Sequence, residues 1–539
     1  MSREQQRAAL HSTIWKIAND LRGSVDGWDF KQYVLGFLFY RFISENVTDY
    51  LTQKAINGGA PASFNYATLD DITAENARFE TVREKGYFIL PSNLFQNVKT
   101  NAKNNPNLNE TLQTVFHNIE GSAIGSASEN DLKGLFDDVD VNSNKLGATV
   151  IQRNEKLVKL IDAIASLDLG NFADHSIDAF GDAYEFLMTM YASNAGKSGG
   201  EFFTPQEVAE LLAKITLVGK TEINKVYDPA CGSGSLLLKF AKILGKDNVR
   251  QGFFGQEINI TTYNLCRINM FLHDINFEKF NIAHGDTLIN PAHIDDEPFE
   301  AIVSNPPYSI NWAGTDNPIL INDPRFSPAG VLAPKSKADL AFTMHMLSWL
   351  ATSGTAAIVE FPGVLYRGGA EQKIRKYLID NNFIDCVIQL PANLFFGVTI
   401  ATCIIVLKKS KNDNATLFID ASKESVHSGN KEKLTDENIT KILQCYTCRG
   451  VLNTPENMSE NSPENTPDEY KHFARLVPNA EIAANDYNIA VSSYVEQQDT
   501  REVINILELN AKIAQIVERQ NELRKSIDEI INDLQGGAL

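Results

Sequence analysis

Four polar residues stand at the ends of successive apolar segments in the middle of the chain. Asp228 ends "NKVYD", Glu257 ends "GFFGQE", Asp286 ends "FNIAHGD", and Asn305 follows "FEAIVS". If these segments are parallel strands, all four residues lie at the carboxyl edge of one sheet, where open α/β sheets bind ligands. Glu257 suits the two hydroxyl groups of a ribose, and Asp286 suits an adenine amino group. Helix caps and turns explain any one of these residues, but they explain four in register poorly.

A glycine turn lies between the first two of these segments. "YDPACGSGSLLL" places Gly232, Ser233 and Gly234 before a helix that starts near Ser235. Glycines permit the tight turn and let backbone N–H groups approach a ligand closely. Leu237 stands where the dinucleotide fingerprint needs a third glycine, and the chain contains no P-loop pattern. The turn therefore argues against nicotinamide, flavin and P-loop nucleotide sites, and by itself it is weak evidence for any ligand.

The fourth segment ends in "SNPPY". Proline cannot donate to a sheet ladder, so Pro306 and Pro307 must stop the strand. They leave a stiff segment that holds Asn305 and Tyr308 at the end of the strand. A strand followed by a proline-rich turn explains "NPP" alone equally well.

The elements that position these residues alternate between strands and helices from about residue 170 to 425. About seven segments have strand composition, and "TAAIVEFP", "IDCVIQLP" and "ATCIIVLKK" complete the series. Such alternation predicts an α/β fold with a parallel sheet covered on both faces. We expect the last two strands, joined by "ANLFFGVTI", to form a hairpin at one edge of the sheet.

The flanking regions have other patterns. Residues 1–165 carry apolar residues at helical spacing, which predicts an N-terminal helical domain. The α/β domain is expected at 166–485, with 422–485 rich in loops because Asn, Glu, Ser, Thr and Pro dominate there. Residues 486–539 form a tail whose helix packs on a partner or, with equal weight, on its own domain. Its a and d positions carry Ile506, Leu509, Ile513, Ile516, Leu523, Ile527, Ile530 and Leu534, with Gln520 as the one polar exception.

Composition sets further limits. No run of 18 apolar residues occurs in the 539-residue chain, and its first residues lack an apolar signal core, so we expect a cytoplasmic protein with no membrane span. Only Cys445 and Cys448 form a C-x-x-C pair among six cysteines, and we expect no metal site. The net charge of −19 indicates that the chain alone would bind DNA weakly, and that a partner would supply phosphate contacts.

A family resemblance rests on these motifs. "DPACGSGS", "GQEIN", "GD" and "NPPY", in that order, resemble the motifs of amino-methyltransferases that use S-adenosylmethionine, and their order is similar to the γ group of adenine-N6 DNA methyltransferases. "WKIANDLRGSVDGWDFKQYVLGFLFYRFISE", "GDAYEFLMTMYASNAGKSGGEFFTP", "SPAGVLAPKSKADLAF" and "LYRGGAEQKIRKYL" resemble the modification (M) subunit of type I restriction-modification systems. The likeness covers nearly the whole chain and is weakest near 455–468. It implies a Rossmann-like methyltransferase sheet between the helical region and a coiled-coil-like tail.

The resemblance implies roles for the "NPPY" residues. The side-chain oxygen of Asn305 and the carbonyl of Pro306, whose direction the proline pair fixes, would accept the two amino hydrogens of adenine, while Tyr308 offers a ring for stacking. The methyl group then moves in line without a general base. The target adenine must be flipped out of the duplex. Phe396 or its neighbour Phe395 is the candidate second aromatic wall, although core packing explains either one nearly as well.

The resemblance also assigns the S-adenosylmethionine site. The upstream "EFFTPQ" would open a helix at Thr204 and Pro205 and leave a hydroxyl and free N–H groups for the methionine carboxylate. Phe202 and Phe203 fit the core equally well. The implied cofactor residues are Glu201, Phe202, Phe203, Thr204, Pro205, Gln206, Asp228, Gly232, Ser233, Gly234, Ser235, Glu257 and Asp286. Basic residues that flank the expected mouth and could contact phosphates are Lys335, Lys337, Arg367, Lys373 and Arg375, of which the last two suit a solvated helix face as well.

The resemblance further implies partners. The chain leaves no room for a domain that reads a DNA sequence, so a separate specificity (S) subunit is expected, with two M chains per S, together with a restriction (R) subunit that cleaves unmodified DNA. DNA is the expected substrate. The alternative is a methyltransferase that acts on a planar nitrogen of RNA or of a protein glutamine, because the chemistry would be identical. A subunit that binds the cofactor without catalysis is the other alternative, and the intact "NPPY" opposes it.

Overall fold

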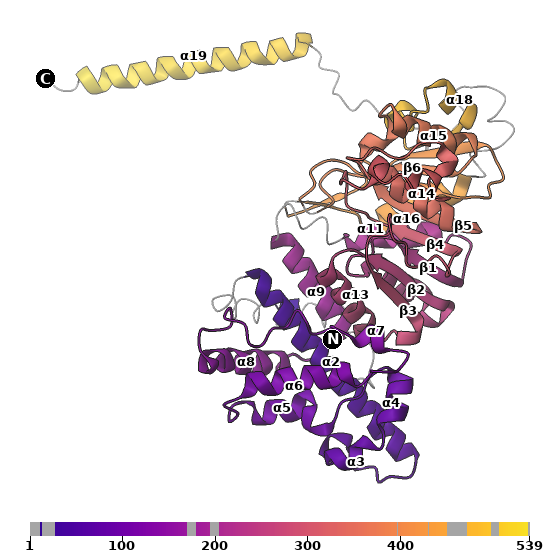
Figure 1. Cartoon of the computed structure of the whole chain (residues 1–539). Helices are drawn as coiled ribbons and strands as arrows, with labels where there is room; N and C mark the ends of the chain where they lie inside the picture. Colours follow the sequence, from indigo (N-terminus) through magenta and orange to yellow (C-terminus); the bar gives the residue numbers. More distant parts are fainter. Residues whose placement is uncertain are drawn as a thin grey trace. The chain divides into compact units, whose positions relative to one another are not determined.

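Figure 1 shows the computed structural model of the chain. The structure describes residues 11–12, 14, 27–169, 179–194, 204–395, 397–429, 431–449, 472–496 and 506–536, without the side chains of 27–31, 179, 189–194, 506–508 and 533–536. Two compact units are present, residues 1–495 and residues 496–539. Within the described ranges, no helix is both long and apolar enough to cross a bilayer.

The first part of the larger unit is helical, as the sequence predicts. Its helices are α2 (Gly27–Asn57), α3 (Asp71–Glu75), α4 (Arg78–Lys85), α5 (Phe95–Ala102), α6 (Leu108–Gly121), α7 (Glu129–Leu132) and α8 (Val150–Ala165). The apolar face of α2 is buried against α5 and α8. Arg41 ties α2 to the end of α8 by donating to the carbonyl oxygens of Ile164 at 2.7 Å and Leu167 at 2.9 Å.

The helical region is packed directly on the α/β region through α9 (Ala179–Asn194) and α13 (Ile260–Leu272) (Figure 1). The buried Arg267 of α13 donates to the carbonyl oxygens of Asn130 at 2.7 Å and Lys133 at 2.9 Å. Tyr184 of α9 donates to the carbonyl oxygen of Leu265 at 2.8 Å. The packing is therefore continuous across residue 165, and the division into a helical domain at 1–165 and an α/β domain at 166–485 stays a prediction.

A nine-stranded sheet forms the centre of the described α/β region. Its order is β11-β8-β6-β7-β5-β4-β1-β2-β3. Strands β3, β2, β1, β4 and β5 are parallel, and β7 is antiparallel to both β5 and β6. The bounds are β1 (Ile223–Asp228), β2 (Val249–Glu257), β3 (Phe280–His284), β4 (Phe299–Ser304), β5 (Leu350–Glu360), β6 (Ile384–Gln389), β7 (Cys403–Leu407), β8 (Ala415–Asp420) and β11 (Ala474–Pro478).

Helices bury both faces of this sheet, which explains why its central strands are apolar throughout. Ala301 and Val303 of β4 lie in the core formed with α11 (Gln206–Thr216), α12 (Ser235–Leu244) and α13. Ile302 faces the opposite core, formed with α14 (Asp339–Trp349) and α15 (Ala370–Asp380). The predicted fold class, an α/β methyltransferase-like sheet between helical regions, is confirmed.

Two expectations about the carboxyl-terminal part of the sheet are wrong. The hairpin of β6 and β7 exists, but it is not at an edge, because β7 lies between β5 and β6 while β8 and β11 extend the sheet beyond them. The described parts of the region 422–485 (residues 422–429, 431–449 and 472–485) also form more regular structure than their polar composition suggests. They contain β9 (Val426–Ser428), β10 (Lys431–Lys433), α16 (Asp436–Thr447), β11 and α18 (Asn479–Ala484).

The helix α16 shows why the composition misled. A capping box of Thr435 and Asn438 starts it, and its apolar side chains Ile439, Ile442 and Cys445 are buried in the core. The local helical spacing is hidden by the polar residues around it. The Asn-, Pro- and Glu-rich stretch near 455–468 lies outside the described residues.

Candidate active site

The site lies where the chain reverses its direction across the sheet. From β1, the chain builds β2 and β3 on one side and β4 and β5 on the other, which makes the carboxyl ends of β1 and β4 a topological switch point. Ser304, the last residue of β4, donates its hydroxyl to Asp228 Oδ1 at 2.9 Å. The Gly285 N–H donates to the carbonyl oxygen of Glu257 at 2.9 Å. These bonds hold the ends of four parallel strands together at one edge.

The carboxyl group of Asp228 is fully buried beneath this edge. Its Oδ1 accepts from the Ala230 N–H at 3.0 Å as well as from Ser304, but its Oδ2 is buried and has no hydrogen-bond partner. Burial raises the pKa of Asp228 to about 7. Because buried polar atoms are nearly always paired in native proteins, the free oxygen marks a place where a hydrogen-bond partner is missing.

The glycine turn packs against the second strand. The Gly232 N–H donates to Glu257 Oε2 at 3.0 Å. Gly234 has a φ of 79°, and a Cβ there would lie 2.7 Å from the Cys266 sulfur, so both conformation and space require glycine. Ser235 opens α12, and the carbonyl of Ser233 accepts from Asn269 Nδ2 at 2.9 Å.

The two other carboxylates have unused acceptor capacity. Glu257 is half-buried, and its second oxygen accepts from the Asn259 N–H at 2.8 Å. Burial raises the pKa of Glu257, and the backbone N–H groups of Asn259 and Gly232 oppose that shift. A carboxylate offers about four acceptor positions, so two remain open. Asp286 is half-buried and accepts from the Leu288 N–H at 2.9 Å through Oδ1.

Asn305 is held from two sides. Its Nδ2 donates to Thr204 Oγ1 at 3.1 Å, and its Oδ1 accepts from the Tyr308 hydroxyl at 2.7 Å. Burial keeps the pKa of Tyr308 well above its usual value, so the phenol stays a donor. Pro306 is buried and Pro307 half-buried. Thr204 and Tyr308 together thus fix the side-chain amide of Asn305 at the end of β4.

Asp339 fixes the residue that follows the motif. Ser309 has a φ of 51°, a left-handed conformation that is unusual for a residue with a side chain, and its N–H donates to Asp339 Oδ1 at 2.9 Å. Asp339 opens α14 and is buried. Sequence reasoning missed this residue, since its contact with Ser309 arises only when α14 packs beside the end of β4.

Two phenylalanines approach Tyr308. Phe361 directly follows β5, with its ring centroid 6.5 Å from that of Tyr308, and Phe395 lies 6.3 Å away in an edge-on arrangement. Phe395 is 2% exposed and belongs to the core. Phe396, the candidate second wall, lies outside the described residues. Phe361 was missed, although "EFP" ends its strand as "SNPP" ends the neighbouring one.

The upstream segment meets the "NPPY" motif through Thr204. Thr204 and Pro205 are buried directly before α11, and Gln206 begins that helix with both amide atoms buried and unpaired. Glu201, Phe202 and Phe203 lie outside the described residues. The predicted catalytic and cofactor residues that the structure describes therefore lie at one edge of the sheet, while their roles stay predictions.

Comparisons with known proteins identify the family of the chain. The family model of the N-6 DNA methylase matches residues 175–503, and that of the HsdM N-terminal domain matches residues 10–164. The chain belongs to the N-6 DNA methylase family. Within this family it is similar along its whole length to type I restriction enzyme methylase subunits, as the sequence motifs predict.

Three relatives show how far the similarity extends. The type I restriction enzyme MpnII methylase subunit of Mycoplasma pneumoniae is 47% identical over 99% of this chain and 97% of that protein. The MjaVII methylase subunit of Methanocaldococcus jannaschii is 28% identical over 96% of this chain and 82% of that protein. The crystal structure of a type I methyltransferase subunit from Streptococcus thermophilus has a TM-score of 0.77 at 35% identity, and the match covers 91% of this chain and all of that one.

We expect Asp228→Asn to change how stability depends on pH. Asp228 has a pKa of about 7 in the folded chain and about 4 when unfolded, so its stabilising contribution is complete below pH 4 and is lost as pH rises to 7. The loss amounts to about 1.4 kcal/mol per pH unit in that window. Asparagine keeps an acceptor oxygen for Ser304 and Ala230 but does not titrate, so the variant does not lose this stability as pH rises. The free energy of unfolding is measured with urea at pH 5 and at pH 8. Between these two pH values, that of the variant should rise by about 2.5 kcal/mol relative to that of the wild type.

The exposed Asp247 provides the control. Asp247→Asn should leave the difference between pH 5 and pH 8 as it is in the wild type. Parallel stability profiles for Asp228→Asn and the wild type would contradict the assignment of a buried, protonated Asp228.

Proposed function

We propose that this member of the N-6 DNA methylase family transfers a methyl group from S-adenosylmethionine to the exocyclic N6 of an adenine in DNA. We further propose that it does so as the modification subunit of a type I system, with a specificity subunit that selects the site and a restriction subunit that cleaves unmodified DNA. The observation that carries the proposal is Asn305, whose amide is fixed by Thr204 and Tyr308 beside the glycine turn.

The residues at the ends of β1, β2 and β3 fit S-adenosylmethionine. The buried Oδ2 of Asp228 lacks a hydrogen-bond partner that the ligand could supply, and Glu257 has two open acceptor positions for ribose hydroxyls. Asp286 would accept from the adenine amino group of the cofactor. The unpaired amide of Gln206 and the N–H groups that open α11 suit the methionine end. When bound, the cofactor supplies an electrophilic methyl group on a sulfonium.

The chain's own residues activate the substrate nitrogen. The N6 of adenine is a poor nucleophile because its lone pair is delocalised into the ring. Asn305 Oδ1 and the carbonyl of Pro306 would accept its two hydrogens and so favour a geometry that frees the lone pair. The Tyr308 hydroxyl uses one acceptor position of Asn305 Oδ1, and a carbonyl oxygen has two. Positioning then supplies most of the rate, and no side chain is needed as a general base before transfer.

A base in a duplex cannot reach this edge of the sheet, so the target must be flipped out. The Tyr308 ring would then support the flipped base, with Phe361 at its border. A flipped adenine exposes both N6 hydrogens to Asn305 and Pro306 at once. Both acceptors must hold a fixed direction to receive the two hydrogens together, and the two prolines supply that stiffness.

We expect Asn305→Ala to abolish methyl transfer while S-adenosylmethionine still binds. The alanine removes one of the two acceptors for N6 but leaves the ends of β1 and β2 intact. Methylation of DNA by the complex with the specificity subunit would be measured with a radiolabelled methyl group, and cofactor affinity by calorimetry. Transfer should fall by at least a hundredfold, with cofactor affinity within about twofold of the wild type.

For Glu257→Ala we expect the main loss in cofactor binding and not in the transfer step. It removes a charged pair of acceptors for the ribose, so cofactor affinity should fall tenfold or more. Transfer should recover in part at saturating cofactor. If Asn305→Ala loses cofactor binding, or if Glu257→Ala keeps it, the roles given to these two residues are wrong.

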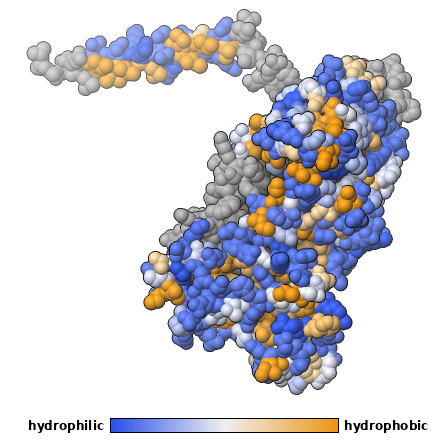
Figure 2. Space-filling view, in the orientation of Figure 1, coloured by the Kyte–Doolittle hydropathy of each residue, from blue (hydrophilic) through white to orange (hydrophobic). Residues whose placement is uncertain are grey.

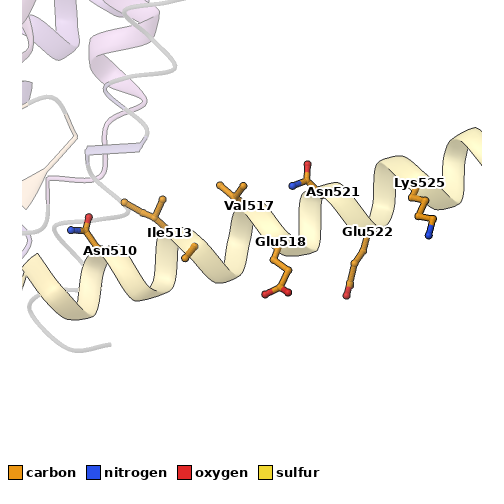
Figure 3. A pocket seen from close by; sticks show the side chains of 8 residues that line it. Asn510, Ile513, Val517, Glu518, Asn521, Glu522 and Lys525 are labelled. Atoms are coloured by element: carbon orange, nitrogen blue, oxygen red, sulfur yellow. The ribbon is translucent and has the colours of Figure 1, made fainter.

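The tail helix is the proposed contact with the specificity subunit. In α19 (Ile506–Gly536), the seam residues Leu509, Ile513, Ile516, Leu523, Ile527 and Ile530 are each between 45% and 67% exposed. Figure 2 shows hydrophobic surface running along this helix, and Figure 3 shows Ile513 and Val517 on one side with Glu518 and Glu522 on the other. An isolated helix with an exposed apolar seam gains stability by packing on a partner helix. We propose two of these chains per specificity subunit.

We expect Ile516→Lys to weaken assembly with the specificity subunit because it places a charge in the seam. Glu518→Lys, on the opposite side of α19, is the matched control and should assemble as the wild type does. Light scattering on the purified complexes gives the mass and the ratio of subunits. A helix that instead packs on its own domain would show a lowered melting temperature for Ile516→Lys and unchanged assembly, which would contradict the proposal.

A further inference from the structure

An arginine lies at the border of the "NPPY" site. After β5 ends at Glu360, Phe361 leads into a short 3₁₀ helix, η10 (Pro362–Leu365), and Arg367 follows before α15 begins. The guanidinium carbon of Arg367 lies 5.7 Å from the centroid of the Phe361 ring. That ring is 6.5 Å from the ring of Tyr308. Arg367 is therefore one side chain away from the ring that would support the flipped base.

The backbone beneath Arg367 makes room for its head group. A Cβ at the buried Gly363 would overlap the guanidinium of Arg367, so the side chain lies directly over this glycine. The backbone N–H of Arg367 also donates to the carbonyl oxygen of Gly363 at 3.1 Å. The turn between β5 and α15 thus fixes where the arginine can lie.

Most of the donors of Arg367 are available. Its one polar side-chain contact among the described residues is with Glu371, where Nη1 and Oε1 are 3.4 Å apart. Burial raises the pKa of Glu371, while the positive charges of Arg367 and Lys337 oppose that shift. The Arg367 side chain is 23% exposed, and a guanidinium carries five N–H donors.

Arg375 shows the contrast. It lies further along α15, is 1% exposed, and donates to the carbonyl oxygens of Tyr487 at 2.8 Å and Val364 at 2.9 Å. The expectation that Arg375 could contact phosphate is therefore wrong, because its donors are used inside the fold. The Arg367 side chain, in contrast, is partly exposed, and Glu371 is its one polar partner among the described residues.

We propose that Arg367 binds a backbone phosphate next to the flipped adenine and so holds the target nucleotide while its base rests on Tyr308. The inference depends on the proposed function. A planar guanidinium matches the oxygens of a phosphate in pairs. The proposal places the phosphate beside a base on Tyr308 within reach of Arg367, which lies against the neighbouring Phe361 ring. Beyond its one ion pair with Glu371, the Arg367 guanidinium has further N–H donors for an anion at this border.

The test uses the complete complex with the specificity subunit and duplex DNA that carries its target. In two further duplexes, the phosphate on the 5′ or the 3′ side of the target adenine is a neutral methylphosphonate. We expect Arg367→Gln to lower kcat/KM for unmodified DNA roughly tenfold or more and to leave cofactor affinity unchanged. One of the methylphosphonates should lower the wild-type rate by a similar factor. It should have little further effect on Arg367→Gln, because both changes remove the same contact.

Two further variants separate this contact from a general effect of charge or folding. Lys376→Gln removes an exposed positive charge from α15 and should behave as the wild type with all three duplexes. Gly363→Ala keeps the charge of Arg367 but displaces its head group, and it should reproduce the Arg367→Gln pattern. Arg367→Lys should restore part of the rate, since an ammonium retains the charge without the paired geometry.

Each outcome decides between the two proposals. If the wild-type complex methylates adenine but the effects of Arg367→Gln and both methylphosphonates multiply independently, the phosphate contact is overturned and the proposed function stands. If Arg367→Gln loses cofactor affinity or stability while Arg367→Lys and Gly363→Ala match the wild type, Arg367 is structural and the inference is again overturned. If the wild-type complex transfers no methyl group to DNA, the proposed function fails and takes the inference with it.

Discussion

The buried carboxyl group of Asp228 joins the two halves of the candidate site. Its Oδ1 accepts from Ser304 at the end of β4, while its backbone leads into the glycine turn that packs on Glu257. The segment that would present the substrate nitrogen therefore stands at a fixed place relative to the segment that would hold the cofactor. Parallel strands in register make this possible, because their carboxyl ends meet at one edge on either side of the switch point.

Burial of polar groups gives this edge its chemical character. Asp228 Oδ2, Asp339 Oδ2, Glu360 Oε2 and the amide of Gln206 are buried without hydrogen-bond partners. Each such atom costs about 1–3 kcal/mol of stability. Burial and the nearby Asp339 hold the pKa of Glu360 well above its usual range. Unpaired polar atoms at a ligand edge are typical of sites whose partners arrive with the ligand.

Local patterns predicted much of the sheet and of the site. Asp228, Glu257 and Asn305 were found because a polar residue directly after an apolar strand has a fixed position in an α/β fold. The strands β8 and β11 and the helix α16 were missed because polar composition concealed short apolar runs such as "ATLFID". Thr204, Asp339 and Phe361 could not be assigned their contacts with the "NPPY" segment. These contacts join residues from 30 to 101 positions apart, and only tertiary packing creates them.

The central claim is that this chain modifies adenine in DNA, and a base-modification map of the host genome tests it most directly. The map would be measured with the gene intact, with the gene deleted, and with the deletion complemented. The account predicts N6-methyladenine at a two-part motif with a fixed gap, lost on deletion and restored by the complementing gene. Unchanged adenine methylation in cells that express the gene together with its partners would contradict the account and would direct attention to RNA or protein glutamine as the acceptor.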